Sequence, residues 1–169
     1  MIEPLLWRPF GWCRVEVDVA GRQRSGGENR GQSRELRAAL PVGTQSEAAW
    51  LLGRLISDAP QGRVPAPLRA RYKAPLRYHF LAWGKSDTCV VATSGRVTRV
   101  TSWVPLGKVQ SLRRVQGPLQ RRLGLASVHL DTAGRRVGAS LLDRDATEAD
   151  QAIAELTALS RAARRRVPR

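Results

Sequence analysis

Residues 123–134 read LGLASVHLDTAG, and residues 10–21 read FGWCRVEVDVAG. Aligned at a constant offset, both stretches place a glycine before alternating apolar positions and end on Asp, one further residue, Ala and Gly. Alternation with a period of two predicts a β-strand that buries one face. The chain therefore carries nearly the same strand twice, and a turn is predicted after each copy.

The repetition continues beyond this strand. A short apolar stretch follows each copy, at residues 37–42 (RAALPV) and 138–143 (GASLLD). A helix-start signal comes next, TQSE at 44–47 and DATE at 145–148, each with an N-cap residue and Glu three positions later. Apolar residues then recur at helical spacing in both copies. The repeat unit is predicted to be strand, turn, strand, helix.

The first copy is the longer one because it contains an insertion. Residues 21–33 (GRQRSGGENRGQS) are rich in Gly, Ser and Arg and have almost no apolar side chains. Such a segment cannot bury enough apolar surface to order itself. We expect a flexible hairpin insertion here.

The second copy follows a series of predicted strands. A turn signal at Ser94-Gly95 separates two of them, and the segment 117–124 (GPLQRRLG) is expected to form a helical corner plugged by Leu119 and Leu123. The strands are expected at 76–82, 88–93, 97–104, 108–116, 125–132 and 135–141.

This order of elements predicts a mainly β fold with helices. Antiparallel strands would form a small open β-barrel or bent sandwich, which the C-terminal α-helix closes. The domains are expected at 1–60 for a partial repeat, 61–75 for a linker and 76–165 for a complete domain. The partial repeat lacks the strands that precede the second copy, so we expect the chain to be a fragment or its start codon to be misplaced.

The charge of the chain is strongly positive. The 169 residues include 29 Lys or Arg and 14 Asp or Glu, for a formal net charge of +15. Such a charge attracts nucleic acid, anionic membranes or acidic proteins. Nearly all the basic residues are arginine, however, which a GC-rich genome produces without selection for binding. Charge alone therefore does not identify the partner.

No sorting or membrane-spanning segment is recognisable. The longest apolar run falls well short of the ~20 residues that cross a bilayer, and the N-terminus lacks the features of a secretory signal. The chain by itself is expected to be soluble and cytoplasmic. Cys13 and Cys89 have no metal-binding spacing and lie in apolar strands, so both are predicted to be core residues.

No catalytic motif is found, and no catalytic residue, metal ligand or cofactor is predicted. His79 and His129 lie in predicted strands, where a structural or surface role is expected. Asp18 and Asp131 precede the predicted turns, and a turn-capping role explains both carboxylates. Glu148 is explained as part of the helix cap. We therefore expect a protein that is not an enzyme.

One stretch of the second copy is exclusively basic. Between Asp87 and Asp131 there is no acidic residue, and Trp103 lies among the cations. On neighbouring strands of a small barrel these cations would form one basic face suited to an anionic membrane. The alternative is that Arg113 and Arg121 brace or solvate the corner. The predicted binding residues are Arg96, Arg99, Lys108, Arg113, Arg114, Arg121 and Arg122.

Residues 104–134 carry a family resemblance. They resemble the bacterial pleckstrin-homology-like (PH-like) domain of YdbS/YdbT-type membrane proteins. The positions that match the pattern of that family are Pro105, Val109, Gln110, Ser111, Gln116, Pro118, Leu119, Gln120, Arg121, Gly124 and Leu125. The resemblance extends over residues ~70–165, and residues 8–21 with the following helix resemble the C-terminal half of another copy.

The resemblance implies a PH-like fold, a strongly bent antiparallel sheet with a C-terminal helix. Members of this family carry several such domains joined to transmembrane helices, which are absent from this sequence. It further implies the C-terminal part of a longer membrane protein, with this domain at the cytoplasmic face of the plasma membrane. The family supplies no catalytic motif.

Three functions remain open at this stage. The first is a non-catalytic binding or assembly module whose partner is anionic lipid or a protein. The second is nucleic-acid binding through the same arginines and the tail at 161–169 (RAARRRVPR), although no nucleic-acid-binding motif is present. The third is a purely structural domain without a ligand. The sequence does not predict the oligomeric state.

Overall fold

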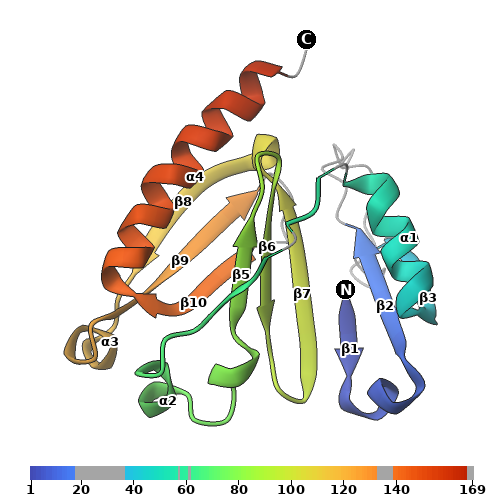
Figure 1. Ribbon diagram of the computed structural model, residues 1–169, viewed down its shortest axis with the longest axis horizontal. Coiled ribbons are helices and arrows are strands. Elements are labelled where there is room, and N and C mark those ends of the chain that lie inside the picture. Colours follow the sequence, from blue (N-terminus) through green and yellow to red (C-terminus); the bar gives the residue numbers. More distant parts are fainter. Residues whose placement is uncertain (18–36, 57, 61, 133–138, 167–169) are drawn as a thin grey trace, which may run out of the picture.

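The computed structural model describes residues 1–17, 37–56, 58–60, 62–132 and 139–166. The strands form two antiparallel sheets, one of seven strands in the order β3-β2-β1-β7-β6-β5-β4 and one of three strands in the order β10-β9-β8 (Figure 1). A long C-terminal helix packs on the three-stranded sheet. This arrangement confirms the predicted PH-like class, mainly β with a closing helix.

The second copy and its lead-in build the larger part of the molecule. Its strands are β4 (Val64–Pro65), β5 (Ala82–Lys85), β6 (Cys89–Ser94), β7 (Thr98–Pro105), β8 (Val109–Val115), β9 (Leu125–Thr132) and β10 (Ala139–Asp145). Its helices are α2 (Ala70–Lys73), α3 (Pro118–Arg122), α4 (Ala146–Arg166) and the 3-10 helices η2 (Tyr78–Phe80) and η3 (Leu106–Lys108).

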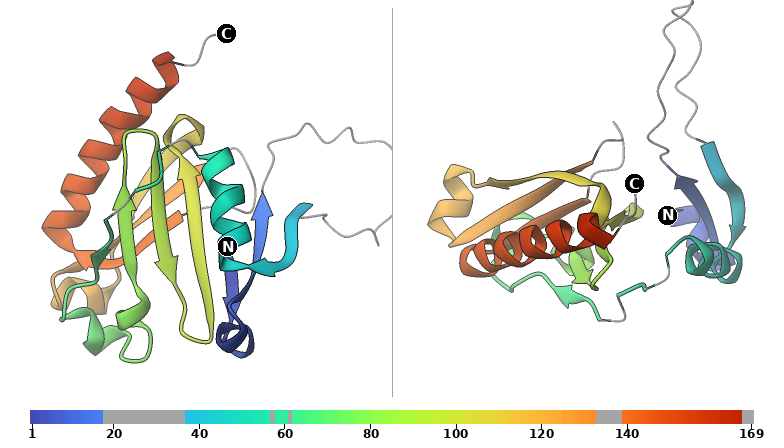
Figure 2. Two further views of the ribbon diagram at one scale, coloured as in Figure 1. Left: turned by 45° about the vertical axis from the view of Figure 1, so that its right-hand side comes forward. Right: turned by 90° about the horizontal axis from the view of Figure 1, so that it is seen from above.

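One hydrophobic core lies between these elements. Val90 and Val104 come from the larger sheet, Leu130 from the smaller one and Leu156 from α4, and all four are almost fully buried. Leu106 of η3 is also fully buried in this core. Helix α4 contacts η3, β8, β9 and β10, so it closes the space between the two sheets (Figures 1 and 2).

The first copy forms a smaller unit beside this core. Its elements are β1 (Ile2–Pro4), η1 (Leu5–Phe10), β2 (Trp12–Val17), β3 (Arg37–Thr44) and α1 (Gln45–Leu55), in the same order as β8, α3, β9, β10 and α4. Its own core is small and consists of Cys13, Val15 and Ala48, with partly buried residues around them. The insertion predicted at 21–33 lies outside the described residues.

The two units share one sheet through β1. Strand β1 pairs antiparallel with β7, and Ile2 lies opposite Val100. The Thr101 amide donates to the Met1 carbonyl at 2.9 Å. On its other side β1 pairs with β2. The first copy therefore extends the larger sheet of the second copy and covers the backbone of β7, which would otherwise be a free edge.

The two predicted helix starts differ in detail. At α1 the capping box is confirmed, because the Glu47 amide donates to Thr44 Oγ1 at 3.3 Å and the Thr44 amide donates to Glu47 Oε2 at 2.8 Å. At α4 the prediction for Glu148 is wrong. Its carboxylate accepts from Trp83 Nε1 at 2.9 Å and from Arg144 Nη2 at 2.6 Å. Burial of the Arg144 guanidinium demands this anionic partner.

Two further predictions are corrected. Residues 76–82 were expected to form a strand, but the amides of Arg77, Tyr78 and Phe80 donate to carbonyls three or four residues earlier, so this stretch forms turns and η2. At the corner, Leu119 is 50% exposed, whereas Gln120 is only 4% exposed. The interior at this point is polar, and an amide side chain fits it better than leucine does.

The polar interior at the corner centres on Asp143, whose side chain is fully buried. Asp143 Oδ1 accepts from Gln120 Nε2 at 2.7 Å and from Lys73 Nζ, and Oδ2 forms an ion pair with Arg77 Nη2 at 3.4 Å. The Asp143 amide donates to Ser127 Oγ at 3.1 Å. The Asp143 carboxylate therefore joins α2, the turn after it and α3 to β10, and the Asp143 amide adds a bond to β9.

The backbone at Asp143 is adapted to this role. The register of β10 against β9 shifts between Leu141 and Arg144, and Asp143 has a positive φ of 53°. A bulge redirects a side chain relative to the regular alternation of a strand. Asp is among the few residues other than Gly that adopt this left-handed conformation readily. At the bulge both Asp143 and the next residue, Arg144, are buried, whereas regular alternation would bury only one of two neighbours.

Replacing this carboxylate should strongly destabilise the protein. Asp143→Ala should lower the free energy of unfolding by about 3 kcal/mol or more, because Lys73, Arg77 and the buried Gln120 amide lose their bonds to this buried carboxylate. Asp143→Asn should cost less, since it keeps the backbone preference and hydrogen bonds. Urea denaturation measures both. The control Asp150→Ala removes an exposed partner of Arg114 and should cost no more than about 1 kcal/mol. Equal losses for Asp143→Ala and Asp150→Ala would contradict this account.

The two cores predict unequal local stability. Amide hydrogen exchange should be slower in β6 and β9, which surround the large core, than in β2 and α1, which cover only the small one. Hydrogen exchange followed by mass spectrometry or NMR makes the comparison. Equal protection in both units would instead show that the β1–β7 pairing makes them open together.

Candidate functional site

Four segments lie side by side along one end of the molecule, the lower end in Figure 1. They are η1, residues 66–80 with α2 and η2, the β6–β7 turn at residues 95–97, and the corner at 117–123 with α3 (Figure 1; left panel of Figure 2). We call the surface of these four segments the basic end. None of their residues is acidic, and eight are Arg or Lys.

Direct contacts connect these segments. Arg8 Nη2 of η1 donates to the Arg96 carbonyl in the β6–β7 turn at 2.6 Å. The guanidinium groups of Arg8 and Arg99 lie 5.9 and 5.8 Å from the centre of the Phe80 ring in η2. At the other side, Asp143 binds both Lys73 of α2 and Gln120 of α3. The basic end is therefore one connected surface built from both copies.

Some cations of the basic end form ion pairs with carboxylates of β10. Arg69 forms an ion pair with Asp145, and Lys73 and Arg77 share Asp143. Hydrogen bonds from Thr147 and the nearby Arg69 hold the pKa of Asp145 below its usual range, so this carboxylate stays charged at neutral pH. These pairs fasten the segment 66–80 to β10.

Other cations of the basic end remain free. Arg71, Arg96, Arg121 and Arg122 are exposed, and none of them forms an ion pair within the described residues. Arg71 donates to the Tyr72 hydroxyl at 3.0 Å. Because the acidic residues nearby are used inside the fold, the outward charge of this end is positive.

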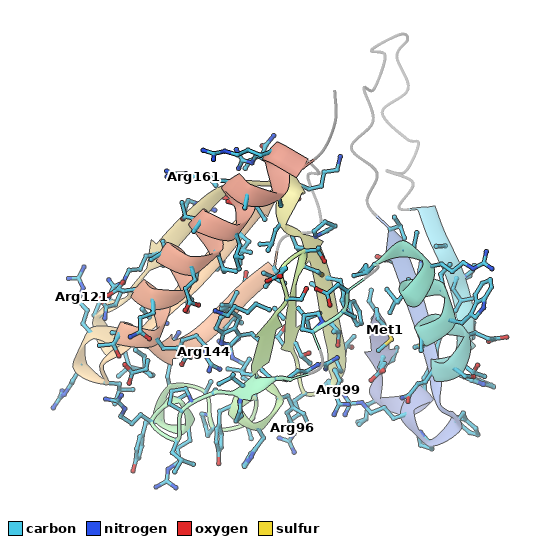
Figure 3. All side chains as sticks on the ribbon, turned by 45° about the horizontal axis from the view of Figure 1, so that its top comes forward. Met1, Arg96, Arg99, Arg121, Arg144 and Arg161 are labelled. Carbon is cyan, nitrogen blue, oxygen red and sulfur yellow. The ribbon has the colours of Figure 1, made fainter. Side chains whose placement is uncertain are left out.

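The seven residues predicted to form one basic face do not lie together. Arg96, Arg121 and Arg122 belong to the basic end, although Arg121 lies well apart from Arg96 and Arg99 (Figure 3). Lys108 lies in η3 at the opposite end (Figure 1). The expected single face would have required these residues to converge, and the fold separates them.

The other three predicted residues have acidic partners. Arg99 lies 3.7 Å from Glu3, Arg113 lies 2.8 Å from Asp131, and Arg114 lies 2.8 Å from Asp150. Arg113 and Arg114 are neighbours on β8, so alternation sends them to opposite faces of the strand. All three cations therefore lie beside an acidic residue, and Arg113 pairs with Asp131 across β8 and β9 and not with the corner that it was expected to brace.

Asp131 and His129 lie on the same outer face as Arg113. Hydrogen bonds from Arg113 and from Ser111 lower the pKa of Asp131. His129 Nδ1 lies 2.8 Å from Ser140 Oγ, which fits the structural role predicted for it. The turn that Asp131 was expected to cap and the matching Asp18 lie outside the described residues.

The segment 66–80 is the part of the basic end that sequence reasoning missed. The sequence predicts a linker at 61–75 and a strand at 76–82. A signal was present, because residues 59–86 contain no acidic residue and Leu68, Tyr72 and Leu76 recur every four positions among Arg and Lys. That pattern indicates a basic amphipathic turn of helix.

Other kinds of site find little support in the described residues. They contain no group of three or more His, Cys, Asp or Glu side chains placed to hold a metal ion. No helix among them is long and apolar enough to cross a membrane. Cys13 and Cys89 are buried and unpaired, as predicted, and burial raises the pKa of the Cys89 thiol to about 11. A thiol with this pKa is a poor nucleophile at neutral pH.

Comparison with known proteins places the domain in a family. Residues 63–160 match the family model described as bacterial PH domain, and this match includes β4, α2 and most of α4. Comparison with curated proteins and with solved structures gave no match. The narrower assignment to YdbS/YdbT-type proteins stays a prediction. The matched region covers more than half of the chain and folds as two bent antiparallel sheets closed by a helix, and the chain therefore belongs to the bacterial PH domain family.

Proposed function

We propose that this chain is a non-catalytic PH-like module that binds an anionic membrane surface through its basic end. The observation that carries the proposal is the concentration of eight Arg and Lys residues, without an acidic one, in four segments at one end of the fold. Each cation near an anionic surface contributes about 1 kcal/mol to binding. The free side chains of Arg71, Arg96, Arg121 and Arg122 supply this attraction.

The distribution of the cations favours a surface over a small ligand. They extend from η1 across the β6–β7 turn to α3 and are not gathered around one cleft. A bilayer offers negative charge over a comparable area. In a longer membrane protein, such contacts would place the module on the cytoplasmic face, where anionic lipids and basic segments meet.

A protein partner or nucleic acid is the competing occupant of this end. Nucleic acid is the weaker alternative, because α3 has only five residues and offers no recognition helix for a groove. An acidic protein would need a complementary shape, for which the described surface gives no separate indication. Duplex DNA as a competitor in the liposome assay tests the nucleic-acid alternative.

Binding to liposomes should depend on the basic end specifically. The wild-type chain should co-sediment with vesicles of phosphatidylglycerol and phosphatidylethanolamine, and not with phosphatidylcholine vesicles, and the binding should weaken as salt rises. Arg121→Gln with Arg122→Gln should reduce the affinity roughly 30-fold, from about 1 kcal/mol for each charge.

The matched control removes the same charge elsewhere. Arg161→Gln with Arg165→Gln changes exposed residues of α4 near its C-terminal end, away from the basic end (Figure 3), and should leave binding nearly unchanged. Equal losses in the two double variants would show that net charge alone acts. Loss of all vesicle binding on addition of duplex DNA at physiological salt would favour a nucleic-acid ligand.

A further inference from the structure

The basic end also exposes large apolar side chains. In the segment 66–80, Leu68 is 72% exposed, Tyr72 is 65% exposed and Leu76 is 66% exposed. In η1, Leu6 is 80% exposed, and Leu5 beside it is also exposed. Single exposed leucines are ordinary, but a group of them among cations on one surface indicates an interaction site.

The geometry of α2 directs these side chains outward. Ala70 and Ala74, four residues apart, are buried against the domain. Leu68 and Tyr72 each lie two positions from a buried alanine, about 200° around a helix with 3.6 residues per turn. The small alanines let the segment lie close to the fold, while the leucine and tyrosine side chains point away from it.

Ion pairs keep this segment in place. Arg69 binds Asp145, and Lys73 and Arg77 bind the buried Asp143. These contacts use the polar side of the segment and hold its backbone against β10. The leucines cannot turn into the core without breaking a buried charged network, so their exposure is a property of the folded state.

A second apolar group projects from η1 at the same end. Helix η1 carries Leu5, Leu6 and Phe10, and Gly11 ends it in a left-handed conformation with φ 65°. Arg8 fastens η1 to the β6–β7 turn through the Arg96 carbonyl. In that turn Val97 is exposed as well. Apolar tips therefore alternate with cations across the whole basic end.

Charge complementarity identifies the occupant of this surface. Exposed apolar residues alone would suit a protein groove or a second copy of the chain. Here they are surrounded by cations on an acid-free surface, and a second copy would bring like charges together. An anionic bilayer presents negative headgroups above an apolar interior. The headgroups match the cations of this surface, and the interior matches its exposed apolar side chains.

We infer that Leu68, Tyr72 and Leu76, together with Leu5 and Leu6, insert into the boundary between headgroups and acyl chains of an anionic bilayer. The domain then stands on the membrane with its basic end down, and α4 rises away from it. The inference rests on the proposed membrane function and adds to it a defined depth and orientation. Electrostatic binding alone requires neither.

The first part of the test removes the apolar side chains without changing charge. Leu68→Ser with Leu76→Ser should weaken binding to phosphatidylglycerol-containing vesicles at least about tenfold, because the variant lacks two leucine side chains that become partly buried in the bilayer on binding. Both residues are exposed, so the fold should persist, which circular dichroism checks. The control Leu55→Ser alters a leucine at the end of α1 that is exposed but lies away from the basic end, and should bind like the wild type.

The second part measures insertion directly. Leu76→Cys, labelled with the environment-sensitive fluorophore NBD, should shift its emission to the blue on anionic vesicles, whereas the same label at Leu55→Cys should not. Cys13 and Cys89 are buried, so they should escape labelling in the folded protein. A blue shift confined to the Leu76 position would support insertion.

The outcomes separate the inference from the proposed function. If wild-type protein binds anionic vesicles, but Leu68→Ser with Leu76→Ser binds equally well and the label shows no shift, insertion is overturned and electrostatic docking stands. Absence of any vesicle binding overturns both. A dimer in solution that the double serine variant dissociates, seen by analytical ultracentrifugation, would assign the surface to a second copy and overturn the inference.

Discussion

The buried carboxylate of Asp143 organises the basic end of this protein. A charge placed inside a protein must be compensated by partners close to it, and here the partners come from α2, the turn after it and α3. A bulge and a left-handed residue in β10 bring the carboxylate to this position. The short helices α2 and α3 are thereby held against the rest of the domain.

The same pairing separates compensated from uncompensated cations at the basic end. Lys73 and Arg77 are partly compensated by Asp143, while Arg121 and Arg122, on the exposed side of α3, have no acidic partner in the described part of the chain. On β8, by contrast, Arg113 and Arg114 each pair with an acidic residue. The net charge is spread over the whole sequence, and the basic end is a part of the surface whose segments contain no acidic residue.

The partial repeat has a structural consequence that its small core does not suggest. Strand β1 pairs with β7 and so attaches the first copy to the sheet of the complete domain. Helix η1 is thereby brought beside the β6–β7 turn, where Arg8 binds the Arg96 carbonyl. The basic end consequently draws on both copies, although the family match covers residues 63–160 of the chain.

Elements that depend on neighbouring residues could be predicted from the sequence. Alternation of apolar side chains located the strands of residues 88–132, the Thr44 cap marked the start of α1, and the family pattern indicated a PH-like fold. Tertiary structure decided the rest. The burial of Gln120 in place of Leu119, the use of Glu148 by Arg144 and the gathering of four basic segments all depend on contacts between residues far apart in the chain. Such contacts cannot be predicted from local patterns, because the residues that the fold places next to a side chain decide whether it is buried, paired or free.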